Sequence, residues 1–100
     1  MTPDGPTFDP VLTSPARLGI VTVLLERGDT AFSDLKLLLR LTQGNLGMHL
    51  GKLEEAGYVR VDKEFVDRKP RTTAVLTDAG RTAFLDHLAR LQAAARRARV

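Results

Sequence analysis

The spacing of the hydrophobic residues changes at Gly57, and this change limits the folds open to the chain. Before it, Leu46, Leu50 and Leu53 recur every three to four residues, which indicates an amphipathic helix. After it, Val59 begins an alternation of apolar and charged residues, which indicates a half-buried strand. A glycine ends a helix at low cost. The sequence therefore predicts a helix that passes directly into a strand.

The helix before Gly57 is expected over residues 42–56, and its two faces differ. Thr42 can cap the first turn through its hydroxyl, and the leucines form the buried face. The opposite face carries Gly44, Asn45, Met48, Gly51 and Lys52. That face has hydrogen-bonding groups, one cation and little bulk, so we interpret it as a contact surface.

Two shorter helices are expected before this one. Ser14 and Pro15 are typical of a helix start, and Gly28 ends that first helix. Residues 29–31 form a short connector with one or two residues of strand, and residues 32–39 form the second helix. Its brief turn into the third helix is typical of a helix-turn-helix. The apolar positions of the first two helices are Leu18, Ile20, Val21, Val23, Leu24, Leu25, Phe32, Leu35, Leu38 and Leu39.

A β-hairpin with a basic tip follows. The alternation places Phe65 with Val59 on the half-buried side, is interrupted over residues 67–70, and resumes over residues 72–76. The tip cations are Arg68, Lys69 and Arg71. Neighbouring cations repel one another unless an anion binds, so we interpret the tip as an anion-binding element, with a simple solvated turn as the alternative. Pro70 would stiffen it.

A long helix over residues 78–98 is expected last, with Thr77 as its cap. Its apolar stripe consists of Phe84, Leu88, Leu91 and Ala95. This stripe exceeds what so small a domain needs for its own core, so residues 84–98 are predicted to pack on a second copy of the chain. Leu12 from the N-terminal segment is expected to join that interface. His87 is expected to be a surface residue.

Composition sets further limits. One hundred residues with 43% hydrophobic content predict a single domain over residues 1–100, in which residues 1–9 are a flexible tail. One helical turn is expected to follow, from Asp9 to Leu12. The net charge of +3 permits nucleic acid as a partner without requiring it. No secretory signal or membrane-spanning stretch of ~20 apolar residues is recognisable, so a cytoplasmic protein without membrane contact is expected.

The side chains needed for catalysis are scarce. The chain contains no cysteine, two separated histidines and no glycine-rich phosphate loop after a strand. The absence of cysteine excludes disulfides and thiolate metal sites. We therefore expect no enzymatic activity, no metal and no cofactor.

Together these elements predict a mainly α, α+β winged helix. It has a three-helix helix-turn-helix core, a two-stranded wing over residues 63–71, and a long C-terminal helix. At this level the chain resembles the compact winged helix-turn-helix transcriptional regulators of the MarR/ArsR type. The segments that carry the resemblance are LTSPARLGIVTVLL, FSDLKLLLRLTQGNLGMHLGKLEEAGYV and RKPRTTAVLTDAGRTAF, and the resemblance covers about residues 12–91.

The resemblance implies a homodimer that binds a pseudo-palindromic operator in double-stranded DNA, more commonly as a repressor. The implied DNA contacts of the third helix are Thr42, Gln43, Asn45, Met48, His49 and Lys52, and those of the wing are Arg68, Lys69 and Arg71. Gln43 and Asn45 have the donor and acceptor pair that reads adenine edges. His49 could reach a phosphate or be packed and hydrogen-bonded. Lys52 could hold a phosphate or pair with Glu54 or Glu55.

The third helix departs from the family pattern at Gly44, Gly47 and Gly51, which replace side chains that could reach bases. Each glycine inside a helix costs up to about 1 kcal/mol relative to alanine. Small residues and Met48 also suit an adaptable apolar surface. An alternative interpretation is therefore a winged helix that docks a protein partner. A small-molecule effector is compatible with either function, and no residue identifies one.

Overall fold

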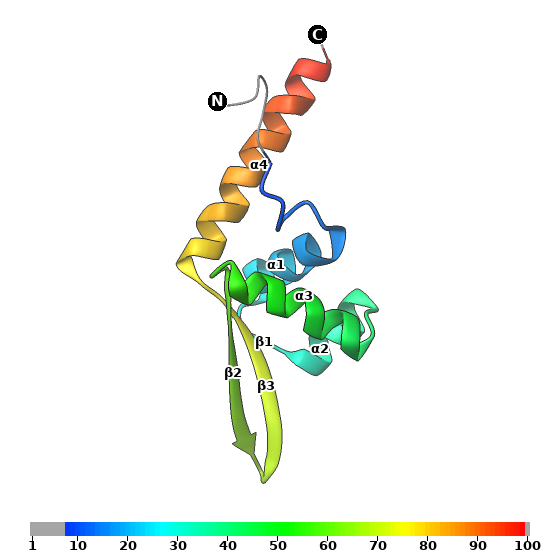
Figure 1. Cartoon of the computed structure of the whole chain (residues 1–100), viewed down its shortest axis with the longest axis vertical. Helices are drawn as coiled ribbons and strands as arrows, with labels where there is room; N and C mark the ends of the chain where they lie inside the picture. Colours follow the sequence, from blue (N-terminus) through cyan, green and yellow to red (C-terminus); the bar gives the residue numbers. More distant parts are fainter. Residues whose placement is uncertain (1–7, 100) are drawn as a thin grey trace.

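The computed structural model describes residues 8–99, and its elements follow the predicted order (Figure 1). The predicted tail therefore lies largely outside the described residues. The elements are α1 (Pro15–Arg27), β1 (Thr30–Ala31), α2 (Phe32–Leu39), α3 (Gln43–Glu55), β2 (Val59–Val66), β3 (Lys69–Leu76) and α4 (Asp78–Ala98). No helix within residues 8–99 is long and apolar enough to cross a bilayer.

The helix boundaries arise from local capping, as the sequence predicts. The hydroxyls of Ser14, Thr42 and Thr77 each accept a hydrogen bond from the backbone amide of the third residue of the following helix. Each bond satisfies one of the amides that a helix start leaves unpaired. Gly28 and Gly57, with φ of 83° and 80°, end α1 and the turn after α3 in the left-handed region.

The strands form one antiparallel sheet in the order β1-β3-β2. β2 and β3 stay paired out to Val66 and Lys69, so the turn contains only Asp67 and Arg68. The predicted interruption over residues 67–70 is thus too long, because Lys69 and the proline after it belong to β3. Both turn residues are left-handed, with φ of 51° and 64°, which a two-residue hairpin turn requires for its twist to match the strands.

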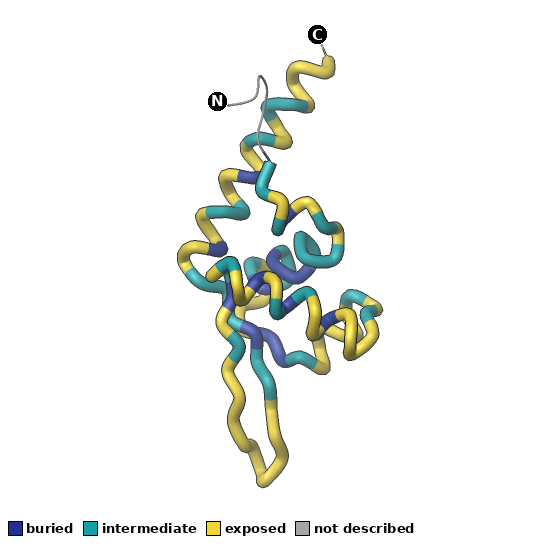
Figure 2. The backbone as a smooth tube through the Cα atoms, viewed as in Figure 1, coloured by how far each residue is buried: buried dark blue, intermediate teal, exposed yellow. Residues whose placement is uncertain are grey.

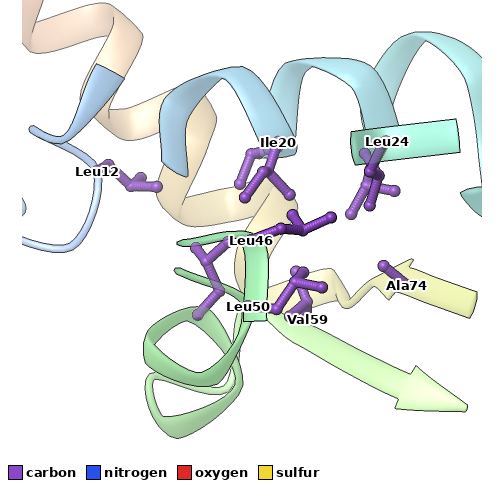
Figure 3. Packing of buried hydrophobic residues seen from close by; sticks show 10 residues of the cluster. Leu12, Ile20, Leu24, Leu46, Leu50, Val59 and Ala74 are labelled. Atoms are coloured by element: carbon purple, nitrogen blue, oxygen red, sulfur yellow. The ribbon is translucent and has the colours of Figure 1, made fainter. Parts of the chain in front are cut away.

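The core lies where α1, α3 and the base of the sheet meet (Figure 3). Its buried members are Leu12, Ile20, Val21, Leu24, Leu35, Leu46, Leu50, Leu53, Val59 and Ala74. The predicted turn from Asp9 to Leu12 is present, with a backbone hydrogen bond of 3.0 Å. Leu12 is 0% exposed. This corrects the prediction that Leu12 faces a second copy, because its side chain has no surface left to offer.

Two parts project from this core in opposite directions, and the molecule measures 57 × 26 × 22 Å (Figure 1). One is the wing, formed by β2, β3 and their turn, and the other is the C-terminal half of α4. Both are largely exposed (Figure 2). Phe65 is 78% exposed, so its predicted half-burial is wrong. The wing extends past the helices that cover its base, so no element reaches Phe65.

The first turn of α4 is tightly joined to the turn between α3 and β2. The Thr77 hydroxyl donates to the carbonyl of Gly57 at 2.6 Å, and the Thr77 amide donates to the carbonyl of Tyr58 at 3.0 Å. Gly80 packs so closely here that a Cβ atom would lie 2.1 Å from that Tyr58 oxygen. Only glycine allows this approach, so α4 and the base of the wing form a close backbone joint.

The start of the described chain is held against the same joint. The Asp9 carboxylate accepts hydrogen bonds from the Val11 amide and from the Tyr58 hydroxyl. The Phe8 ring lies edge-on to the His87 ring, with centroids 5.9 Å apart. His87 is only 4% exposed, so the prediction of a surface histidine is wrong. Phe8 and Asp9 likewise belong to the packed body, although the tail was predicted to include them.

Candidate nucleic-acid interface

The outer face of α3 meets solvent as the sequence predicts. Leu46, Leu50 and Leu53 point into the core, and the polar residues occupy the remaining surface. Met48 is 48% exposed. The other exposed members of the predicted contact set are Thr42, Gln43, Asn45 and Lys52. Thr42 is also the helix cap, so its hydroxyl is already engaged with the amide of Asn45.

His49 is the member of the set that lies partly buried, and it has a protein partner. Nη1 of Arg17 lies 3.1 Å from Nδ1 of His49. Burial lowers the pKa of the imidazole first, and the charges of Arg17 and Lys52 lower it further. The packed and hydrogen-bonded histidine, one of the two predicted possibilities, is therefore present, and a phosphate contact through the other ring nitrogen stays a prediction. Sequence reasoning missed Arg17, because the contact joins residues 32 positions apart.

Lys52 is exposed and makes no ion pair with any residue from 8 to 99. The ion pairs found there are Arg60 with Asp62 and Asp86 with Arg90. The predicted partners on α3, Glu54 and Glu55, are therefore not used, and the ammonium group stays available to an external anion.

The wing cations Arg68, Lys69 and Arg71 are exposed, and within the described chain none forms an ion pair. Lys69 and Arg71 are two residues apart on β3 and share one face of the wing. Lys63 pairs in register with Thr72 and lies on the other face, toward α3. Sequence reasoning did not single out Lys63, because its face depends on the exact register of the hairpin.

A groove of about 400 Å³ runs between α3 and the wing. Its lining includes Gln43, Gly47, Gly51 and Glu54 from α3, with Lys63 from the wing. A duplex that enters from the exposed side of α3 would therefore meet wing residues as well.

The chain's own packing does not explain the three glycines of α3. Beyond the helix itself, a Cβ atom added at Gly44, Gly47 or Gly51 would meet nothing within 4 Å in the described part of the chain, and each residue has ordinary helical geometry. The three glycines therefore lower the stability of α3, and the packing of the described chain does not require them.

The predicted interface residues of α4 differ in their surroundings. Phe84 is half-buried against the core, whereas Leu88 and Leu91 are 40% and 41% exposed. Ala95 is exposed, and Leu85, which was not predicted, presents a further apolar side chain. The apolar stripe thus passes from the core onto a surface that nothing in the described chain covers.

Within residues 8–99, no three histidine, aspartate or glutamate side chains gather as metal ligands. What the geometry provides is an exposed polar helix face beside a projecting basic hairpin. Residues 16–95 match the model of the winged helix DNA-binding domain family. The chain belongs to that family. It is a family of DNA-binding transcriptional regulators and is not enzymatic.

Known proteins of similar length share this fold. The transcriptional regulator homologue from Pyrococcus horikoshii is 38% identical, with a TM-score of 0.84 over 90% of this chain and 89% of that one. A putative transcriptional regulator from Thermoplasma acidophilum is 25% identical, with a TM-score of 0.69 over 90% of each chain. An uncharacterized protein of Methanocaldococcus jannaschii is 36% identical over 78% of this chain and 85% of its own length. The predicted fold and family resemblance are confirmed.

Proposed function

We propose that this winged helix protein is a repressor that binds a pseudo-palindromic operator as a homodimer. The observation that carries the proposal is the pairing of an exposed, polar α3 face with a projecting wing whose cations have no ion-pair partner among residues 8–99. Clustered cations of this kind favour a polyanion, because each phosphate contact also releases condensed counterions.

In this proposal α3 enters the major groove and the wing follows the adjacent backbone. Arg68, Lys69 and Arg71 neutralise phosphates and supply most of the affinity. Asn45 and Gln43 supply limited base preference, and DNA shape supplies the rest, since the glycines leave few side chains to read bases.

The exposed apolar residues of α4 support the proposed homodimer. Leu85, Leu88 and Leu91 expose an apolar stripe on a helix whose C-terminal half projects from the body (Figure 2). A helix so little supported is marginal in water, and an apolar stripe gains stability when a second copy covers it. A two-fold dimer would present two α3 helices to successive major grooves, roughly 34 Å apart, and would occlude the promoter between them.

One observation favours a second function, the docking of a protein partner. Phe65 is exposed on the wing and Met48 on α3, and apolar side chains at these positions suit contact with a protein surface that excludes water. If protein docking is the function, DNA affinity should be weak and should not depend steeply on salt.

The test is fluorescence anisotropy with a labelled duplex from the region upstream of the protein's own gene, titrated at several salt concentrations beside a scrambled duplex. A specific regulator should prefer the upstream duplex by a factor of ~10³ or more and show a steep salt slope. A steep slope without preference would leave a nonspecific DNA binder. The absence of binding at low salt would overturn the proposal in favour of protein docking.

A further inference from the structure

The hydrogen bond between Arg17 and His49 fixes which imidazole nitrogen carries the proton. An arginine side chain has only donors, so Nδ1 of His49 must accept from Nη1 of Arg17 at 3.1 Å. A neutral imidazole then carries its proton on Nε2. The lowered pKa of His49, caused first by burial and then by Arg17 and Lys52, agrees with this neutral tautomer.

The Nε2 donor of His49 is open to solvent. It has no hydrogen-bond partner within residues 8–99, and the one buried side-chain nitrogen or oxygen without a partner there is Nδ1 of His87. Nε2 of His49 is therefore not buried. The bond from Arg17 holds the imidazole in one orientation, so the donor is presented in a fixed direction.

Arg17 is itself held in place. Its Nε donates to the carbonyl of Val11 at 2.7 Å, which leaves part of the guanidinium free beyond the bond to His49. Arg17 and Lys52 both line a shallow groove of about 380 Å³ at the N-terminal side of the body. This groove shares no lining residue with the one between α3 and the wing.

We propose that Arg17, His49 and Lys52 form a phosphate-binding site for the DNA strand that borders α3 on the side away from the wing. Two cations and one oriented neutral donor match the charge and acceptor oxygens of a backbone phosphate. Glu55 also lines the groove and would repel a phosphate at that end, so the phosphate is expected near Arg17, whose guanidinium contacts His49 at the edge of the groove. The inference rests on the proposed DNA-binding function and adds a second backbone contact to that of the wing.

In this arrangement Arg17 acts in two ways. Its charge attracts the phosphate directly, and its hydrogen bond makes His49 a donor. A duplex would then be held on both flanks of α3, by the wing on one side and by this site on the other. Backbone contacts on both flanks would explain how a glycine-rich helix with few base-reading side chains is held in register on DNA.

Two substitutions of His49 separate a phosphate contact from a structural role. In His49→Gln the amide nitrogen can take the place of Nε2, so a donor to phosphate remains while the acceptor for Arg17 is lost. In His49→Asn the amide oxygen can take the place of Nδ1, so the acceptor remains while the donor is lost. Anisotropy titrations should find that His49→Asn weakens DNA binding about tenfold and His49→Gln changes it much less. The opposite order would show that His49 only supports Arg17 and would overturn the site.

The salt dependence supplies an independent readout. Arg17→Gln should flatten the salt slope by about one, because one cation no longer displaces a counterion. His49→Asn should lower the affinity without changing the slope, since a neutral donor releases no counterion. Arg27→Gln, at the exposed other end of α1, removes the same charge and should leave the slope unchanged. Equal slopes for the Arg17 and Arg27 variants would overturn the site.

Arg71→Ala distinguishes failure of this site from failure of the DNA-binding function. If Arg71→Ala weakens DNA binding while the Arg17 and His49 variants bind like the wild type, only the phosphate site is refuted. If the wild type does not bind DNA at low salt, both proposals are refuted. Thermal unfolding of each variant should give a single transition near that of the wild type, which ensures that the comparison concerns folded protein.

Discussion

The wing and the C-terminal half of α4 leave the same small core at opposite ends, and they expose different chemistry. The middle of α4, where the helix leaves the body, presents Leu85, Leu88 and Leu91. The wing instead presents a basic tip that forms no ion pair within residues 8–99. Apolar surface is stabilised by a partner that excludes water. Clustered cations are stabilised by an anion, and salt screens the attraction. In the proposed function, the surface for self-association and the surface for DNA would therefore lie at opposite ends of the long axis of the molecule.

The largest expected effect comes from Leu88→Asp in α4. A buried charge at the proposed interface should produce monomers and lower the affinity for a two-half-site duplex about 10²-fold, because the second half-site no longer binds intramolecularly. Light scattering gives the mass, and anisotropy gives the affinity. Ala89→Asp adds the same charge at an exposed neighbouring position and should remain dimeric. A dimeric Leu88→Asp protein would refute the interface.

The next effect comes from Arg71→Ala in the wing. Loss of one phosphate contact should weaken binding about tenfold for all sequences alike and flatten the salt slope by about one. Arg97→Ala, near the exposed end of α4, removes an equal charge and should leave both quantities unchanged. A change in sequence preference for Arg71→Ala would contradict a purely backbone role. Equal effects of Arg71→Ala and Arg97→Ala would show that the wing and the end of α4 do not differ in their contribution to DNA binding.

Arg68→Gly should separate stability from function within the wing itself. Arg68 has a φ of 64°, a conformation that costs a residue with a Cβ roughly 1–2 kcal/mol and costs glycine little. We expect the free energy of unfolding of this variant, measured by urea titration, to be about 1 kcal/mol higher than that of the wild type. The variant should also bind DNA less tightly and show a flatter salt slope. Unchanged DNA binding would mean that Arg68 serves the turn alone.

A smaller effect is expected at α3, between the two regions. Gly47→Ala should raise the free energy of unfolding by up to about 1 kcal/mol, because the methyl group would meet nothing within 4 Å outside its own helix among residues 8–99, and alanine favours the helix. If DNA approaches the backbone of α3 closely, the same methyl group should lower DNA affinity. A more stable variant that binds DNA as well as the wild type would show that the close approach does not occur at this position.

The smallest expected change concerns pH at the joint. The hydrogen bond to Asp9, then burial, then the charge of Asp9 raise the pKa of Tyr58 from 10.0 to about 12. The folded state therefore keeps its proton where the unfolded state loses it, so this stability is present below pH 10 and lost as the pH rises to about 12. Tyr58→Phe should flatten the fall in stability over that window. Tyr58 is the single tyrosine, so tyrosinate absorbance reports its titration directly; a midpoint near 10 would contradict the contact.

The local patterns predicted the elements well, because caps, glycines and hydrophobic period act within a few residues. Ser14, Thr42 and Thr77 cap the helices as expected. The errors arise where distant segments meet. His87 is buried where α4 meets α1 and the Phe8 ring near the other end of the chain, and Phe65 is exposed because the wing extends past the described helices. Alternation shows which residues share a face but not whether anything covers that face.

In the candidate interface, too, local patterns predict some features and long-range packing determines the others. The exposure of Asn45 and Arg68 follows from one helix face and one hairpin tip, so the sequence could predict it. The bond between Arg17 and His49 requires α1 and α3 to pack in a particular register, and the position of Lys63 requires the exact pairing of β2 with β3. Neither can be obtained from a single element.

The close backbone contact between Gly80 and Tyr58 has a mechanical consequence. Each wing strand has eight residues, so the tip lies roughly 26 Å beyond this point. Because hydrogen bonds and this close approach join the start of α4 to the base of the wing, we expect the two elements to rotate together. A rotation of about 10° about this contact would move the tip by ~5 Å, more than the rise of roughly 3.4 Å between successive phosphates of one DNA strand. If two copies pair through α4, a slight change in the crossing angle of the two α4 helices would move both wing tips away from the phosphates that they contact on one duplex.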